Sequence, residues 1–292
     1  MAEMIYPTSG YALVQGGELY YEVAGSGPAV VLVHAGIADL RMWDAQVPAL
    51  SERFCVVRFD CRGFGRSRSE PVPFSNRQDV VALLDHLGIA RAALVGCSRG
   101  GMIALDTALE FPERVAALVW VCSGIGGWWP PEGIAPPEEV ALIEAMETAE
   151  RAGDHERTAA LDVRLWVDGP LQPEGRADPE VRRQVYAMAL NNYRSHAHLS
   201  ALGLTPQPLD PPAVGRLAEL RMPILAFVGL LDSAETAAAA EILAREAPDV
   251  RVEIYPDAAH LPNMERPERF NAHLLGFLDG LPDRAFASVP AS

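Results

Sequence analysis

Two adjacent side chains in the stretch ALVGCSRGGM (residues 93–102) could act as nucleophiles, the thiol of Cys97 and the hydroxyl of Ser98. The central letters GCSRG (96–100) form a G-x-S-x-G pattern that follows an apolar run. Where this pattern joins a buried strand to a helix, the turn is so tight that its central side chain projects above the sheet and its neighbours must be small. We therefore predict Ser98 as the nucleophile and place Cys97 at the end of the strand, inside the packing. Taken alone, the pattern fits a helix-capping serine equally well.

A serine hydroxyl needs a base beside it, and that base needs an acid to hold its tautomer. After a nucleophile on such a turn, these partners are expected in the order acid, then histidine, each on a loop that follows a strand. Asp232 ends the stretch FVGLLD, and His260 ends IYPDAAH, which follows the next apolar run. We predict that Asp232 orients His260 and that His260 is the base. Glu235 is a weaker candidate for the acid, and Asp257 is expected to be a turn residue.

Acyl transfer also needs N–H groups that stabilise the oxyanion of the tetrahedral intermediate. One is expected on the residue after the nucleophile, here Arg99, and the other on the loop HAGI (34–37) that follows the first long apolar run. On that loop Gly36 is the first choice of donor and Ile37 the second, and we also expect Ile37 to contact substrate. We expect His34 to organise the loop rather than to act as a base.

These residues need a scaffold, and the chain alternates apolar runs with helical patterns in a way that supplies one. Short segments at 11–15 and 19–23, separated by Gly16 and Gly17, predict a β-hairpin. The later runs are apolar throughout, which is typical of strands buried on both faces of a parallel sheet. The predicted fold class is α/β, with a mostly parallel central sheet flanked by helices. Strands are expected at 29–33, 53–60, 92–96, 115–122, 223–229 and 250–256, and helices at 40–53, 76–87, 101–110, 234–247 and 267–278.

The alternation stops after Ser123 and returns about ninety residues later. The interval carries glycines, prolines and tryptophans and then charged helical stretches, with no good strand. We predict a helical cap, or lid, at 124–212, inserted into a core made of 1–123 and 213–292. Tryptophans of this interval are expected to line an apolar cleft beneath the cap, although packing between cap and core would explain them as well. They are Trp128, Trp129 and Trp166.

Five short motifs together resemble the α/β-hydrolase superfamily: HAGI, DCRGFGRS, GCSRGG, GLLD and AAH, all between Tyr11 and Leu281. The resemblance implies an active site between sheet and cap that uses no cofactor and no metal. Dehalogenases and epoxide hydrolases of the superfamily need an aspartate at the nucleophile position, so Ser98 argues against both. We expect a serine hydrolase that cleaves a small to medium carboxylic ester or lactone through an acyl-enzyme.

Other functions are open on the same residues. A carbon–carbon bond hydrolase and an enol-lactone hydrolase would use the same triad, because the cap selects the substrate. A ligand-binding, receptor-like protein on a hydrolase scaffold could keep all three triad residues without turning any substrate over. The motifs alone do not separate these classes from a simple esterase.

Arg99 departs from the pattern of many superfamily members, which carry methionine after the nucleophile. A positive side chain is unfavourable at a helix N-terminus, by about 0.3–1 kcal/mol. Two explanations are open: Arg99 pairs with a carboxylate of the cap, or it binds a carboxylate of the substrate. We favour the pairing within the protein, and the candidate partners are Glu138, Glu139 and Glu144.

The charge pattern limits the partners of the chain. Its 292 residues include 39 acidic side chains and 24 arginines but no lysine, for a formal net charge of −15. This excess of negative charge argues against binding to nucleic acid or to an anionic membrane surface. The start of the chain lacks the features of a secretory signal, and there is no long apolar run or Cys-x-x-Cys pair. We therefore expect free thiols, a cytoplasmic location, a small-molecule substrate, and a monomer or homodimer.

Overall fold

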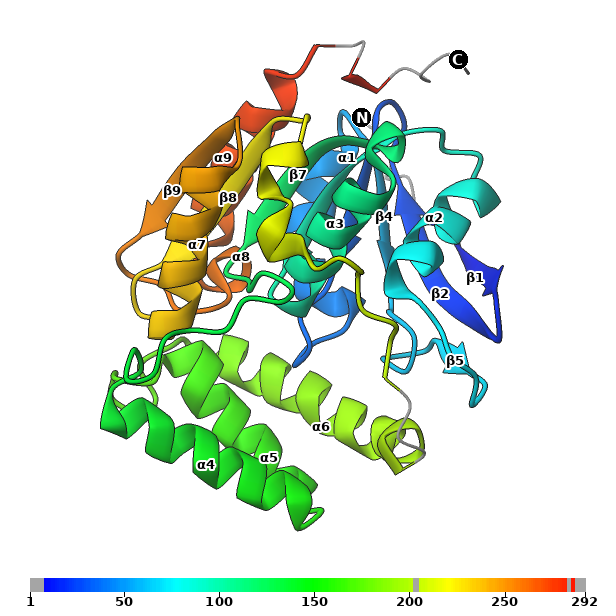
Figure 1. Ribbon diagram of the computed structural model, residues 1–292. Coiled ribbons are helices and arrows are strands. Elements are labelled where there is room, and N and C mark those ends of the chain that lie inside the picture. The colour runs from blue at the N-terminus through cyan, green and yellow to red at the C-terminus, as the bar shows by residue number, and fades with distance from the viewer. Residues whose placement is uncertain (1–7, 202–204, 283–284, 287–292) are drawn as a thin grey trace.

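A nine-stranded sheet forms the centre of the molecule (Figure 1). The computed structural model describes residues 8–201, 205–282 and 285–286, without the side chains of residues 196–201. In order across the sheet the strands are β1 (Thr8–Val14), β2 (Gly17–Ala24), β4 (Cys55–Phe59), β3 (Ala29–Val33), β6 (Ala92–Cys97), β7 (Val115–Val121), β8 (Ile224–Gly229) and β9 (Val250–Tyr255), and the short β5 (Arg68–Ser69) pairs with β2. The strands β3, β6 and β7 thus occupy the middle of the sheet.

Most of the sheet is parallel. From β4 to β9 every neighbouring pair runs in the same direction, whereas β2 pairs antiparallel with β1, β4 and β5. The central strands β3, β6, β7 and β8 are buried along their whole length, because both faces of a parallel sheet are covered. The predicted α/β fold with a mostly parallel sheet is confirmed. So is the hairpin, whose turn uses Gly16 at a φ of 69°.

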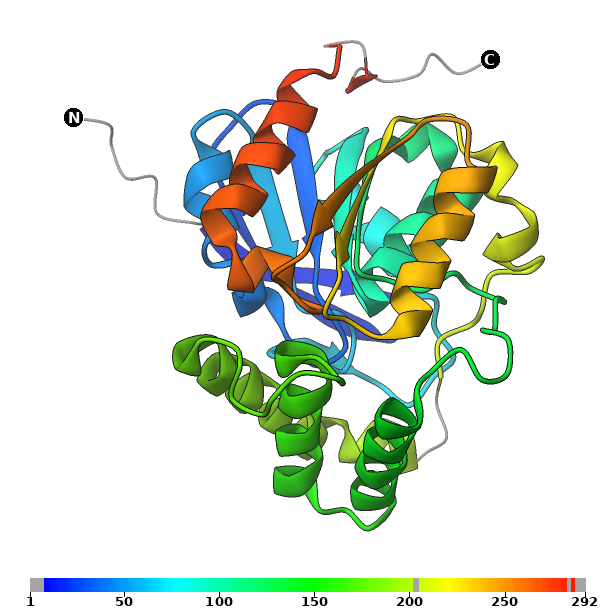
Figure 2. The same cartoon turned by 90° about the vertical axis from the view of Figure 1, so that its left-hand side faces the viewer.

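Two groups of helices cover the two faces of the sheet (Figure 2). These helices are α1 (Gln46–Ser51), α2 (Asn76–His86), α3 (Arg99–Glu110), α7 (Ala234–Glu246) and α9 (Pro267–Asp279). On one face α2, α3 and α7 bury Leu83, Leu105 and Leu243, while on the other face α1 and α9 bury Leu50 and Phe270. Each face therefore has its own apolar core, and this burial is the main force that holds helices to sheet.

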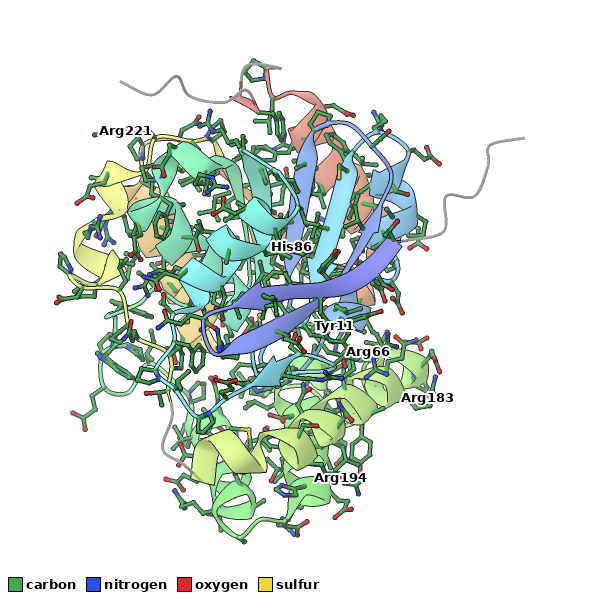
Figure 3. All side chains as sticks on the ribbon, turned by 90° about the vertical axis from the view of Figure 1, so that its right-hand side faces the viewer. Tyr11, Arg66, His86, Arg183, Arg194 and Arg221 are labelled. Atoms are coloured by element: carbon green, nitrogen blue, oxygen red, sulfur yellow. The ribbon has the colours of Figure 1, made fainter. Side chains whose placement is uncertain are left out.

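A third group of helices lies beyond the carboxyl ends of the parallel strands (Figure 1). It contains α4 (Pro137–Arg151), α5 (His155–Asp162), the π-helix η3 (Val163–Asp168) and α6 (Pro179–Ala201). Arg183 and Arg194 lie on the exposed side of α6 (Figure 3). Within the described residues no strand occurs between Val121 and Ile224. We call α4, η3, α5 and α6 the helical layer; its extent as a separate domain, 124–212, stays a prediction.

None of the helices in the described part of the chain combines the length and the hydropathy that a membrane crossing needs. The longest of them, α6, carries arginines, asparagines and histidines along its length.

The continuous helix predicted at 40–53 is wrong, because two short helices replace it, the 3-10 helix η1 (Leu40–Trp43) and α1. Pro48 accounts for the break: it has no N–H to donate, and its ring clashes with the carbonyl of the residue four positions earlier, here Asp44. Short helices that the sequence did not predict are η2 (Pro112–Arg114), η4 (Ala213–Gly215), η5 (Leu217–Glu219) and α8 (Pro262–Glu265).

The turn between β6 and α3 depends on the glycines that flank it. A Cβ at Gly96 would lie 2.1 Å from the carbonyl oxygen of Gly100, and a Cβ at Gly100 would lie 2.2 Å from the carbonyl oxygen of Val33 on β3. Both obstacles are backbone atoms, which cannot rotate away as the end of a long side chain can. The start of α3 therefore packs against β3 and β6 at a distance that only glycine allows.

We predict that Gly100→Ala destabilises the fold by about 1–3 kcal/mol or more, because the added methyl must displace the backbone of β3. Gly276→Ala is the matched control: it also lies inside a helix, α9, and a Cβ there meets nothing within 4 Å. The control should stabilise the fold by about 0.4–1 kcal/mol, because alanine lowers the conformational entropy of the unfolded chain. Urea unfolding followed by circular dichroism measures both, and equal stability of the two variants would contradict this packing.

Candidate active site

Ser98 lies at the tip of the turn between β6 and α3, with a φ of 54° and a ψ of −122°. A positive φ costs a residue other than glycine about 1–3 kcal/mol and persists only where surrounding contacts hold it. The Ser98 N–H donates to the carbonyl of Val121 at 2.8 Å. The Ser98 carbonyl accepts from the Gly101 N–H at 2.8 Å and from the Ser123 hydroxyl at 2.6 Å. These bonds fix the backbone on both sides and hold Ser98 at the start of α3.

A short hydrogen bond joins His260 to Asp232. The distance from His260 Nδ1 to Asp232 Oδ2 is 2.7 Å, and both side chains are almost completely buried. Asp232 follows β8, and His260 lies on the loop after β9, so the ends of two neighbouring strands bring them together. Because a carboxylate only accepts hydrogen bonds, Nδ1 carries the hydrogen and Nε2 keeps the lone pair of a base.

The loop that carries His260 packs against the turn that carries Ser98. Cys97 Sγ lies 3.6 Å from the carbonyl oxygen of His260. Within the described ranges the Ser98 hydroxyl makes no hydrogen bond to His260, a contact that in many enzymes tightens only in the substrate complex. The two other acids that the sequence suggested do not pair with His260. Asp257 forms an exposed ion pair with Arg266. Among the residues described, the carboxylate that pairs with His260 is that of Asp232 and not that of Glu235.

The loop after β3 brings Gly36 against Arg99. A Cβ at Gly36 would lie 3.8 Å from Arg99 Cβ, so the backbones that carry the two predicted oxyanion donors are neighbours. In the part of the chain that the structure covers, the Gly36 N–H has no hydrogen-bond acceptor. His34 organises this loop: its Nε2 accepts from the Cys61 N–H at 2.9 Å, and its Nδ1 donates to the Ala35 carbonyl at 2.8 Å. With both ring nitrogens engaged, His34 is not placed to act as a base.

The four cysteines are free thiols, and Cys61, Cys97 and Cys122 are buried. Burial raises the pKa of Cys97 and of Cys122 well above the usual value for a thiol, because the thiolate would lose its solvation. Cys97 is thus a packed thiol beside Ser98 and not an activated one. Among the described residues no three His, Cys, Asp or Glu side chains are arranged to hold a metal ion.

Of the three tryptophans predicted to line a cleft, the structure brings one to His260. The Trp166 ring, on the π-helix η3, lies 4.5 Å from the His260 ring between centroids, and the Trp166 carbonyl accepts from the His260 N–H at 3.1 Å. Trp128 packs against the apolar core of α3 and α7, and Trp129 is 84% exposed. Ile37 is partly buried against the core on the face of α1 and α9.

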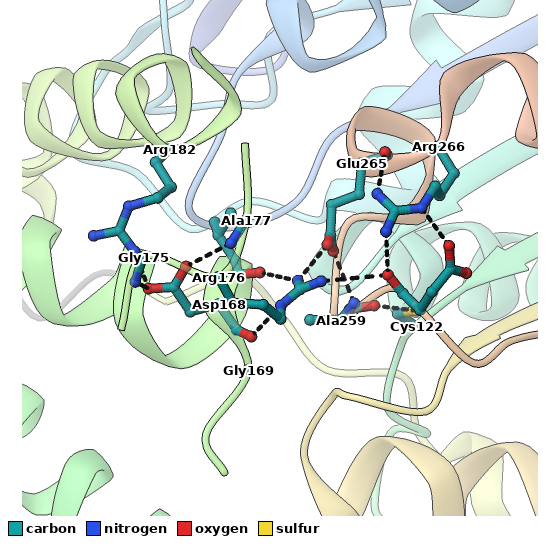
Figure 4. A network of polar contacts seen from close by, with 12 residues as sticks. Cys122, Asp168, Gly169, Gly175, Arg176, Ala177, Arg182, Ala259, Glu265 and Arg266 are labelled. Carbon is teal, nitrogen blue, oxygen red and sulfur yellow. Dashed lines mark hydrogen bonds and ion pairs between the residues drawn. The ribbon is translucent and has the colours of Figure 1, made fainter. Parts of the chain in front are cut away.

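A network of charged side chains joins the helical layer to the loop that precedes α8 (Figure 4). Arg176 donates to the carbonyl oxygens of Val167 and Asp168, each at 2.7 Å, and pairs with the carboxylate of Glu265. The second Glu265 oxygen accepts from the Ala259 N–H at 2.8 Å. Burial raises the pKa of Glu265, and the Arg176 cation opposes that rise. The network therefore fixes the residue just before the histidine to the end of the π-helix.

No sequence pattern predicts this network. Arg176 and Glu265 are 89 positions apart, and each stands in a polar stretch that is typical of a solvent-exposed loop or helix start. Charged residues in such stretches are normally exposed, so their burial follows only from the packing of the helical layer on the sheet.

Asn192 on α6 is a second contact that sequence reasoning missed. Its Nδ2 donates to the Ala38 carbonyl at 2.8 Å and its Oδ1 accepts from the Gly65 N–H at 3.4 Å, so α6 holds the loops after β3 and β4. A signal for it exists, because Asn192 occupies the next position of a buried helical stripe and is polar. The apolar members of that stripe are Val185, Met188 and Ala189.

The ion pair that we favoured for Arg99 is not formed with any described residue. Instead, Arg99 Nη2 donates to Asn76 Oδ1 at 3.2 Å. Glu139 is turned away, because its carboxylate accepts from the Ala234 N–H at 3.4 Å, at the start of α7. That helix start attracts the acid, since its unpaired N–H groups are the positive end of the helix.

We predict that Arg176→Met destabilises the protein by about 3–5 kcal/mol, because it leaves the buried Glu265 without its cation. Arg183→Met is the matched control, since both side chains of the ion pair between Arg183 and Glu180 are exposed. Its loss should therefore change the stability of the protein little. Chemical denaturation of both variants gives the comparison. A loss no larger in Arg176→Met than in Arg183→Met would show that the network is not structural.

The chain is similar to known proteins in sequence and in fold. Residues 28–267 match the family model described as alpha/beta hydrolase fold. The chain is 30% identical over 290 residues to a 2-hydroxy-6-oxononadienedioate/2-hydroxy-6-oxononatrienedioate hydrolase of Paraburkholderia phymatum, with 93% of this chain and 96% of that one covered. Similar solved structures include a thermophilic esterase from Thermogutta terrifontis, with 27% identity, a TM-score of 0.75 and coverage of 94% and 99%. Another is the enol-lactonase from Burkholderia xenovorans, with 26% identity, a TM-score of 0.73 and coverage of 92% and 100%. The chain belongs to the α/β-hydrolase family.

Proposed function

We propose that this protein is a serine hydrolase that cleaves a small to medium carboxylic ester or lactone through an acyl-enzyme. The observation that carries the proposal is the 2.7 Å contact between His260 Nδ1 and Asp232 Oδ2, on the loop that packs against the positive-φ turn of Ser98. The similarity to an esterase and to an enol-lactonase supports the same class of substrate.

In the first half of the reaction, the Ser98 hydroxyl attacks the carbonyl carbon while His260 Nε2 takes its proton. The carbonyl oxygen becomes an oxyanion, and we assign the backbone N–H groups of Gly36 and Arg99 to hold it. Asp232 keeps the His260 ring in the tautomer that has a free Nε2 and stabilises the imidazolium. The bond to the leaving oxygen then breaks as His260 returns the proton to it, which leaves the acyl group on Ser98.

In the second half, a water molecule replaces the leaving group. His260 Nε2 takes a proton from this water, whose oxygen attacks the acyl carbon and forms a second oxyanion in the same place. Collapse of this intermediate breaks the bond to Ser98, which regains its proton from His260. The products are the carboxylic acid and free enzyme. For a lactone the two halves open the ring, and acid and alcohol leave as one molecule.

A second candidate function is hydrolysis of a carbon–carbon bond by the same residues. It is favoured by one observation, the 30% identity to a dienedioate hydrolase over nearly the whole chain. A panel of esters, lactones and vinylogous diketones separates the two reactions. If no member of the panel is turned over, both hydrolase functions fail and a receptor-like binding protein becomes the better account.

We predict that Ser98→Ala lowers kcat/KM for p-nitrophenyl butyrate about a thousandfold or more, because the nucleophile is lost. Cys97→Ala is the neighbouring control and should keep most of the activity, since its thiol is packed and not activated. Initial rates of p-nitrophenolate release measure both. A loss in Cys97→Ala as deep as that in Ser98→Ala would overturn the assignment of the nucleophile.

A further inference from the structure

We propose that the substrate carries a free carboxylate and that the Arg99 side chain binds it, an inference that rests on the hydrolase function proposed above. The ester or lactone would thus be a half-ester, or a lactone with an acid substituent. The carboxylate would be held next to the nucleophile by the residue whose backbone N–H faces the oxyanion.

The guanidinium of Arg99 is held in place but is not neutralised. Its Nη2 donates to Asn76 Oδ1 at 3.2 Å, and its central carbon lies 4.6 Å from the centroid of the Phe64 ring. Its Nη1 is buried and has no hydrogen-bond partner. No ion pair joins Arg99 to a described carboxylate, although the chain has 39 acidic residues. Two groups interact with the Arg99 cation: Asp79, which is already paired with Arg62, and the buried thiol of Cys61, whose pKa is lowered by His34 and by Arg99 against the effect of burial.

A buried donor of a charged group without an acceptor is costly, and so is a cation at the positive end of a helix. Arg99 combines both, because it is the first residue of α3. A neutral methionine would avoid both costs at this position. A bound anion would compensate the charge of the Arg99 guanidinium and would be favoured by the start of the helix as well. The cost of placing a cation at the helix start is therefore offset in a complex with an anion.

A cavity of about 410 Å³ runs along α3 from Arg99. Arg99, Met102, Ile103 and Asp106 line it from α3, where their spacing of three and four positions places them on one face of the helix. Leu209 and prolines of the segment 206–212 form much of the opposite wall. The cavity thus offers apolar walls and the Arg99 cation to a ligand; its lining includes Arg99, the residue after Ser98, but not Ser98 or His260.

The other charges of the cavity favour a single negative charge. Arg77, the second cation, is engaged with Glu110 and with the Gln207 carbonyl. Burial raises the pKa of Asp106 to about 6, so this carboxyl is ionised above that pH and repels a phosphate with nearly two charges more strongly than a carboxylate with one. A carboxylate has two oxygens that accept hydrogen bonds, and the site has donors for both. The Arg99 guanidinium can donate to one oxygen; Asn76 uses its Oδ1 as acceptor for Arg99, so its Nδ2 hydrogens can donate to the other.

The test compares p-nitrophenyl half-esters of adipic and suberic acid with their own methyl esters, which lack only the negative charge. In the wild type we expect kcat/KM to be higher for each half-ester. In Arg99→Met the ratio of kcat/KM for half-ester over methyl ester should fall about tenfold or more, because a charge-assisted hydrogen bond is lost. Arg99→Lys should recover part of the ratio, since it restores the charge without the planar fork.

Arg53→Met is the matched control, because Arg53 is exposed and lies just before β4. It is therefore at the amino ends of the parallel strands, whereas the proposed active site is at their carboxyl ends. Its ratio should equal that of the wild type, and thermal unfolding checks that every variant is folded. An unchanged ratio in Arg99→Met, or a wild type that does not favour the half-esters, overturns the carboxylate inference alone. Loss of the proposed function itself looks different: Ser98→Ala would then hydrolyse both esters as fast as the wild type.

Discussion

The backbone of α3 starts within van der Waals contact of two strands, and the arrangement of the site depends on this close approach. A Cβ at Gly96 would meet the backbone of Gly100, and a Cβ at Gly100 would meet the backbone of Val33, at distances that exclude any side chain. The chain can then turn from β6 into α3 in one residue, Ser98, at a positive φ. The same approach sets Arg99 beside Gly36, so one packing constraint positions the proposed nucleophile and the proposed oxyanion donors.

The helical layer covers the proposed site and also helps to position two of its loops, which carry His260 and Gly36. Trp166 contacts the His260 ring and accepts from its N–H, and Arg176 ties the preceding residue through Glu265. On the other side Asn192 holds the loop that contains Gly36. Motion of this layer would therefore alter the proposed base and the proposed oxyanion site together.

The local parts of the fold could be predicted because short-range chemistry determines them. Gly16 marks the hairpin, and the Ser75 side chain caps α2 by accepting from the Gln78 N–H. The predicted order of Ser98, Asp232 and His260 likewise follows strand ends, which apolar runs reveal. Contacts between distant segments could not be predicted. The ion pair of Arg176 with Glu265 and the neighbours of Arg99 depend on how the helical layer settles on the sheet, and no local pattern encodes that geometry.

Covalent labelling tests most directly whether Ser98 is a nucleophile that His260 activates. A fluorophosphonate reacts covalently with such a serine, and peptide mapping by mass spectrometry then locates the modified residue. We predict one label per chain, on Ser98, with labelling abolished in Ser98→Ala and strongly slowed in His260→Ala. A label on Cys97 or on a serine outside the site, or no label on the folded protein, would contradict it.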